Sequence, residues 1–87
     1  LQVIGDSMID AGIRDQDWVI IHSQNSADEG QIIVALIDHT ETTLKYLHHS
    51  KGGFIELRPA NTALSPMRYM SDRVLIQGVL VAQMRTY

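Results

Sequence analysis

Hydrophobic and polar positions alternate along most of this chain in short runs that predict β-strands rather than helices. No stretch shows helical periodicity beyond a single turn after Met8. The run Gln31–Ile37 is apolar at almost every position, which indicates a central strand with both faces covered. The other predicted strands are Leu1–Ile4, Trp18–His22 (a buried strand), Thr42–Leu47, Phe54–Arg58 and the long run Val74–Ala82. The pattern predicts an all-β domain of antiparallel hairpins, coiled into a small, partly open barrel.

Turn signals separate these runs. Loops are predicted at Asp10–Asp17, Ser23–Gly30 and Pro59–Pro66, and hairpin turns at Asp38–Glu41 and His48–Gly53. Gly78 lies inside the longest apolar run, where a glycine suggests a bulge or bend.

Composition narrows the class of protein. The chain has 87 residues, of which 45% are hydrophobic, so residues 1–87 form one folded domain. A net charge of −3 with no basic face argues against direct nucleic-acid binding. Without cysteine there are no disulfides or thiolate metal sites, and we expect a cytoplasmic protein with no cofactor and no bound metal. No apolar run is long enough to span a bilayer. The chain has no initiator methionine and begins inside a strand-like run, so we expect a fragment of a longer protein.

The most informative stretch is Gly5-Asp6-Ser7-Met8, which follows the first apolar run. A serine at a sharp backbone turn presents its hydroxyl outward, and the N–H groups of such a turn are free to bind an oxyanion. Ser7 is therefore a candidate nucleophile. The simpler alternative is a turn with no chemistry.

A serine nucleophile needs a base, and the sequence offers two kinds. The four histidines, His22, His39, His48 and His49, have no neighbours that mark one of them as a base. Lys45 is more unusual, because it lies within a predicted strand and shares a face with Thr43 and Leu47. Desolvation there would lower the lysine pKa and favour the neutral amine, although a mid-strand lysine is commonly an edge charge that opposes aggregation.

Two other constellations have simpler explanations. His48 and His49 could suggest a metal site, but adjacent residues in a strand point to opposite faces. Asp15 and Asp17 could form a carboxylate pair for acid–base chemistry, yet both are typical turn residues that bond nearby backbone.

Several short motifs in one order resemble the catalytic domain of the LexA family of self-cleaving repressors. They are Gly5-Asp6-Ser7-Met8, Asp15-Gln16-Asp17-Trp18, Gly30-Gln31, Thr43-Leu44-Lys45, Leu57-Arg58-Pro59-Ala60-Asn61 and Gly78. The resemblance implies the fold shared with signal peptidases, a serine endopeptidase with Ser7 as nucleophile and Lys45 as general base, and an oxyanion hole formed by the backbone N–H groups of Asp6 and Ser7. It also implies intramolecular cleavage of an upstream Ala–Gly bond, which inactivates the repressor in the SOS response.

The same resemblance implies partners. A RecA filament on single-stranded DNA would stimulate cleavage, and a homodimer would form through the region 74–86. Operator DNA would be bound only through an N-terminal domain that, like the cleavage loop, is absent from this sequence. Three alternatives are a UmuD-like processed module that binds a translesion polymerase, a signal peptidase, and a small β-domain without chemistry.

Two departures from the family pattern affect the prediction. Gln16 stands where the family usually has glycine, and a positive φ there would cost about 1 kcal/mol. The hairpin at Asp38–Glu41 is one residue longer than usual. A one-residue slip would turn Lys45 to the wrong face, but we expect the turn to absorb the extra residue.

Overall fold

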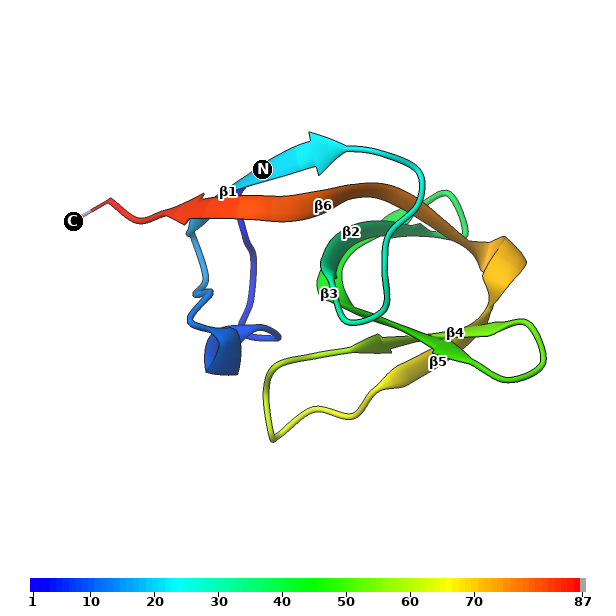
Figure 1. Ribbon diagram of the computed structural model, residues 1–87. Helices are drawn as coiled ribbons and strands as arrows, with labels where there is room; N and C mark the ends of the chain where they lie inside the picture. Colours follow the sequence, from blue (N-terminus) through cyan, green and yellow to red (C-terminus); the bar gives the residue numbers. More distant parts are fainter. Residues whose placement is uncertain (87) are drawn as a thin grey trace.

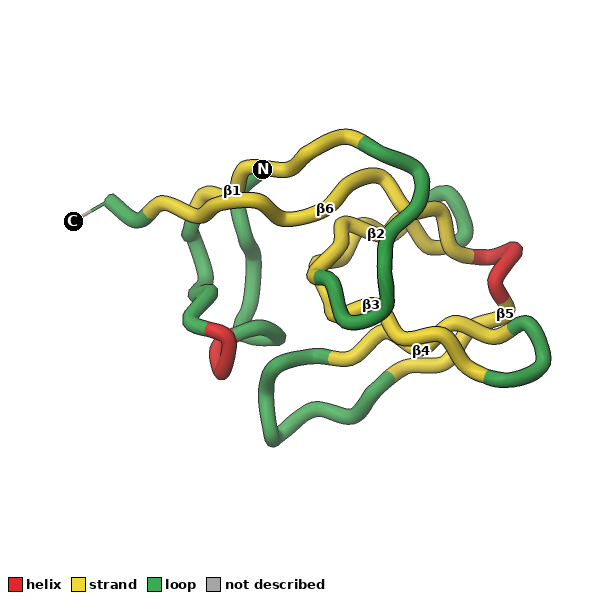
Figure 2. Tube along the Cα trace, viewed as in Figure 1, coloured by secondary structure: helices red, strands yellow, loops and turns green. Residues whose placement is uncertain are grey.

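The computed structural model describes residues 1–86 as a single antiparallel sheet with two short 3-10 helices (Figures 1 and 2). The strands follow the order β1-β6-β2-β3-β4-β5 across the sheet. Their bounds are β1 Trp18–Ser23, β2 Ile32–Ile37, β3 Glu41–Ser50, β4 Phe54–Arg58, β5 Met67–Met70 and β6 Val74–Met84, with η1 at Ile9–Ala11 and η2 at Ser71–Arg73.

The sheet curls but does not close. Figure 1 shows β2 and β3 curving so that the β4–β5 hairpin lies on the other side of the molecule from β6. β1 and β5 remain the two edges of the sheet, and no pairing joins them within residues 1–86. The prediction of an all-β chain is therefore confirmed, whereas the predicted barrel is only a curled open sheet.

β2 is the central strand that its apolar pattern predicted, with β6 on one side and β3 on the other. Alternate residues enter two different cores, because successive side chains of a strand point to opposite faces. Ile33 and Ala35 belong to the cluster enclosed by β3–β6, and both are completely buried. Val34 belongs to a second cluster formed with Met8, Ile13, Val19 and Leu44. This second core attaches the N-terminal segment to the sheet.

Several predicted strands differ from those observed. Leu1–Ile4 forms one isolated bridge, Gln2 to Trp18, instead of a strand. Trp18–His22 is an edge strand in which only Val19 is buried, so the prediction of a buried strand is wrong. β3 continues through His48 and His49, which were expected in a turn. β5 was not predicted, because its four residues alternate too briefly to give a signal.

Gly78 lies at the irregularity that its position suggested. The register between β2 and β6 shifts between Val34 and Ala35, and Gly78 pairs with Val34. A Cβ atom at Gly78 would lie 2.7 Å from the carbonyl oxygen of His22 in β1, so only glycine lets the strands approach this closely.

The longer hairpin keeps the expected register. Asp38 and His39 both adopt positive φ, and the Thr40 N–H closes the turn on the Ile37 carbonyl at 3.0 Å. β3 then leaves the turn with Lys45 opposite Ile33. The turn thus absorbs the extra residue.

Gln16 has a φ of 71°, in the left-handed region that costs a residue with a Cβ atom about 1–2 kcal/mol. Replacing Gln16 with glycine should relieve this strain, although the greater freedom of glycine in the unfolded chain offsets part of it. We expect Gln16→Gly to raise the free energy of unfolding by about 0.5–1 kcal/mol. Urea denaturation measures the change. Gln16→Ala is the control, since alanine keeps the strain, and a glycine variant no more stable than the alanine variant would contradict the prediction.

Candidate active site

The turn that carries Ser7 is fixed by contacts of the neighbouring residues. Met8, the next residue, is only 1% exposed in the core shared with Ile13 and Leu44. Gly5 adopts a φ of 88° and donates its N–H to the Asp15 carboxylate at 2.7 Å. The single helical turn expected after Met8 is η1, whose Ile9 N–H donates to the Asp6 carbonyl at 3.3 Å. These contacts fix the backbone while Ser7 itself stays partly exposed.

A distant loop supports the same turn. The Ala60 N–H donates to the Ser7 carbonyl at 2.7 Å, and the Asp10 N–H donates to the Ala60 carbonyl at 2.6 Å. The Asn61 side-chain amide donates to the Asp6 carbonyl at 2.8 Å. The loop that follows β4 therefore forms one side of the support for the serine.

Lys45 in β3 reaches the serine from the sheet. Its Nζ donates to Ser7 Oγ at 3.1 Å, across 38 positions of sequence. It also donates a very short hydrogen bond to Thr43 Oγ1. Thr43 and Lys45 share a strand face, as their spacing predicted, and both are partly buried. The structure thus brings together the two residues that the sequence paired.

Burial determines the charge state of this lysine. Desolvation lowers the pKa of Lys45 from its usual 10.5, because water no longer fully solvates the ammonium. The carboxylate of Glu41 opposes this by raising the pKa, since a negative charge favours the protonated form. Desolvation is the larger effect, so the neutral amine is more accessible than in an exposed lysine.

The Ser7–Lys45 pair faces an open cleft of about 480 Å³. Its walls come from the N-terminal segment, from the first half of β3 and from Leu64. β3 pairs with β4 only from Tyr46 onward, whereas it pairs with β2 from Glu41. Residues 41–45 therefore have no β4 partner where they border the cleft.

The backbone N–H groups of Asp6 and Ser7 are available at this cleft. Both residues line it, and neither N–H donates a hydrogen bond to any acceptor among residues 1–86. Free amides next to a nucleophile are the usual means of stabilising an oxyanion.

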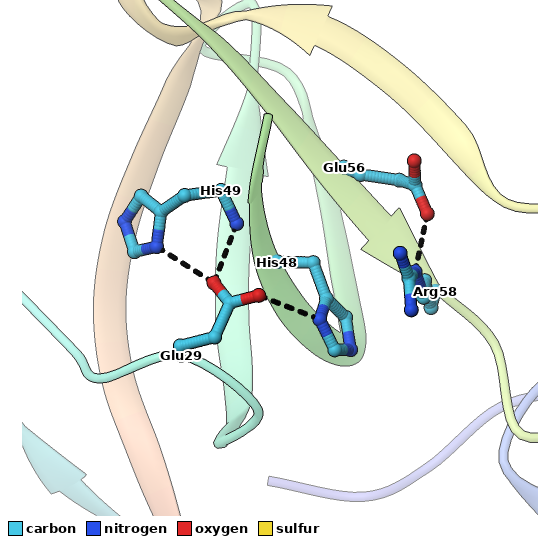
Figure 3. A network of polar contacts seen from close by, with 5 residues as sticks. All are labelled: Glu29, His48, His49, Glu56 and Arg58. Atoms are coloured by element: carbon cyan, nitrogen blue, oxygen red, sulfur yellow. Dashed lines mark hydrogen bonds and ion pairs between the residues drawn. The ribbon is translucent and has the colours of Figure 1, made fainter. Parts of the chain in front are cut away.

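None of the four histidines lines this cleft. Figure 3 shows His48 and His49 both turned toward Glu29, at 2.8 and 2.9 Å from its carboxylate oxygens. The His49 N–H and the two imidazoles hold the pKa of Glu29 at about 2. The contact fastens the loop before β2 onto β3, so these histidines support the fold rather than the serine.

Asp17 bonds nearby backbone, as the simpler interpretation predicted, whereas Asp15 bonds the backbone of Gly5, ten positions away. Asp15 accepts the Gly5 N–H, and Asp17 accepts the Arg14 N–H at 2.8 Å. Asp17 is only 2% exposed and forms an ion pair with Arg85, which together with the Arg14 N–H holds its pKa at about 2. This pair ties the chain after β6 to the loop that follows the serine.

Three polar residues near the pair were not predicted to act there. Thr43 and Glu41 could have been found from their spacing, since residues two and four positions before Lys45 lie on its face of the strand. Asn61 belongs to a motif noted in the sequence, but nothing local indicates that its side chain reaches Asp6.

Comparison with known proteins identifies the family. Residues 1–81 match the family described as Peptidase S24-like. The whole chain is 52% identical to a LexA repressor of Zymomonas mobilis, and covers 40% of that protein. It is 54% identical to a LexA repressor of Gluconacetobacter diazotrophicus and 45% identical to one of Novosphingobium aromaticivorans, covering 34% and 37% of them.

The chain thus spans about two fifths or less of the length of these relatives. Among residues 1–86, no helix is long and apolar enough to cross a membrane. The family match, together with the full-length similarity to LexA repressors, establishes that the chain belongs to the Peptidase S24-like family of serine peptidases, LexA type.

Proposed function

We propose that this domain is a serine endopeptidase in which Ser7 is the nucleophile and Lys45 the general base. The observation that carries the proposal is the 3.1 Å contact between Lys45 Nζ and Ser7 Oγ in a cleft where desolvation lowers the lysine pKa. A neutral amine at hydrogen-bonding distance can take the hydroxyl proton as the nucleophile attacks.

The reaction would proceed in two stages, acylation of Ser7 and hydrolysis of the acyl-enzyme. Ser7 Oγ bonds to the substrate carbonyl carbon while its proton moves to Nζ, and the carbonyl electrons become an oxyanion that the Asp6 and Ser7 N–H groups bind. The oxyanion collapses, the C–N bond breaks, and Nζ returns the proton to the leaving amine. Water then attacks the acyl-enzyme with Lys45 again acting as base, which releases the acid and restores Ser7.

The substrate would bind as an extended strand along residues 41–45. This part of β3 has no β4 partner and borders the cleft, so its backbone can pair with an incoming peptide. The cleft is lined in part by apolar side chains, including Ile4 and Leu64, which suits a peptide with small apolar residues.

We propose that the chain is part of a longer protein with the LexA type of action. The domain would cut an Ala–Gly bond upstream of Ser7 within the same chain, stimulated by a RecA filament on single-stranded DNA, in the cytoplasm. The domain would also dimerise through residues 74–86, so cleavage would separate an N-terminal operator-binding domain from its dimerisation partner. Unlinked halves bind paired half-sites much more weakly, which would end repression. The curled open sheet is compatible with the LexA and signal-peptidase fold.

The test uses this domain and a separate peptide. A peptide of about ten residues with a central Ala–Gly bond should be cut at that bond alone, with fragments identified by mass spectrometry. A peptide with D-alanine before glycine is the matched control and should remain intact. If the Ala–Gly peptide with L-alanine also remains intact at high pH, while the domain captures a translesion polymerase, the UmuD-like alternative replaces the peptidase.

A further inference from the structure

We infer that Asn61 is a positioning residue that aims the Ser7 N–H at the oxyanion. The inference rests on the proposed function, because it concerns how the oxyanion hole is assembled.

The Asp6–Ser7 peptide contains both the Asp6 carbonyl and the Ser7 N–H. In a trans peptide these two groups point in opposite directions, and no peptide bond among residues 1–86 is cis. Whatever holds the carbonyl on one side therefore directs the N–H to the other side.

The Asp6 carbonyl is held by two donors. Asn61 Nδ2 lies 2.8 Å from it, and the Ile9 N–H lies at the longer distance of 3.3 Å. The Ser7 N–H points the opposite way within the same peptide plane. It has no acceptor among residues 1–86, and Ser7 lines the cleft. The shorter of the two anchors is thus a side chain 55 positions away from Asp6.

Asn61 is itself held in place. Its Oδ1 accepts the Ala63 N–H at 2.9 Å, which fixes the side chain and leaves Nδ2 for Asp6. Two neighbouring hydrogen bonds keep the loop at this distance: the Ala60 N–H donates to the Ser7 carbonyl, and the Thr62 N–H donates to the Asp10 carboxylate. The Asn61 amide therefore has one acceptor role within its own loop and one donor role toward the peptide next to the nucleophile.

Two substitutions separate these roles. Asn61→Asp keeps an oxygen for the Ala63 N–H but removes the donor to Asp6, whereas Asn61→Ala removes both. Loss of an entire oxyanion donor lowers kcat by about 10²–10³-fold, so loss of its anchor should lower kcat by about 10–100-fold in both variants. KM should change little, because the oxyanion exists only after attack. Thr62→Ala is the control, since it alters an exposed side chain and keeps the backbone bonds.

A peptide boronate with alanine at the bonding position reports on the oxyanion hole. Its affinity should fall in both Asn61 variants by the same factor as kcat/KM, with no change in Thr62→Ala. The pH at half-maximal rate should be unchanged in Asn61→Ala, because Lys45 is untouched. An Asn61→Asp variant with wild-type kcat and boronate affinity would overturn the inference, and would assign Asn61 to loop packing alone.

The orientation of the amide can also be measured without catalysis. In a ¹⁵N–¹H spectrum, the Ser7 amide signal should move in both Asn61 variants and remain in place in Thr62→Ala. If the wild-type domain neither cuts peptide nor binds boronate, but the Ser7 signal moves as expected, the proposed peptidase fails while the positioning by Asn61 stands. An unmoved Ser7 signal overturns the positioning itself.

Discussion

Replacing either Ser7 or Lys45 with alanine should abolish peptide cleavage while the fold remains intact. Each residue acts only as part of the pair, so removal of one should cost nearly as much as removal of both, about 10⁴-fold or more in kcat. Cleavage of the Ala–Gly peptide, followed by mass spectrometry, measures the loss. Ser65→Ala and Lys51→Ala are matched controls, because both residues are exposed and neither lines the cleft.

The stability of a Lys45→Met variant should separate the role of the lysine in cleavage from any role in folding. The folded state lowers the Lys45 pKa below 10.5, so the unfolded chain binds more protons between the folded and unfolded pKa values. The folded protein therefore carries a desolvation cost that is complete below the folded pKa, shrinks as pH rises from the folded pKa toward 10.5, and is absent above 10.5. Lys45→Met should thus be at least as stable as the wild type at pH 7 in a thermal melt. A lysine variant that unfolds, or one that cuts peptide at the wild-type rate, would count against the assigned role.

The pairing of Ser7 with Lys45 was predictable because it depends on local geometry at both ends. Glycine before a serine marks a turn, and period-two alternation assigns Lys45 to a strand face before any partner is known. The family resemblance then joined the two ends, and the 3.1 Å contact agrees with that pairing.

Features that depend on tertiary context were harder to predict. Trp18 and Ile20 are exposed because they lie on the face of β1 opposite the buried Val19, and an apolar run alone does not reveal that one face of its strand stays uncovered. Likewise, closure of the sheet depends on whether β1 and β5 meet, which no single segment encodes.

The contacts that hold the Ser7 turn show the same division. Gly5, Met8 and Asp15 are near Ser7 in sequence, and their turn and core roles follow from residue type. Asn61 contributes through a bond that spans 55 positions, so its role appears only when the loop after β4 is folded against the serine turn.

Cleavage should increase with pH because only the neutral form of Lys45 can accept the Ser7 proton. Below the Lys45 pKa the neutral fraction rises about tenfold per pH unit, and kcat should follow it to a plateau above the pKa. Initial rates on the Ala–Gly peptide, measured in buffers of constant ionic strength, give this profile. A rate independent of pH would indicate that Lys45 does not act as the base.

Glu41 shifts the pH range in which that rise occurs. Its carboxylate raises the Lys45 pKa against the larger effect of desolvation, so Glu41→Gln should move the midpoint to lower pH. The variant should therefore be faster than the wild type at every pH below the midpoint and equal to it on the plateau. Glu56→Gln, a glutamate that pairs with Arg58 outside the cleft, should leave the midpoint unchanged. If Glu41→Gln lowers the plateau rate instead, Glu41 acts by contacting the substrate and not by raising the Lys45 pKa.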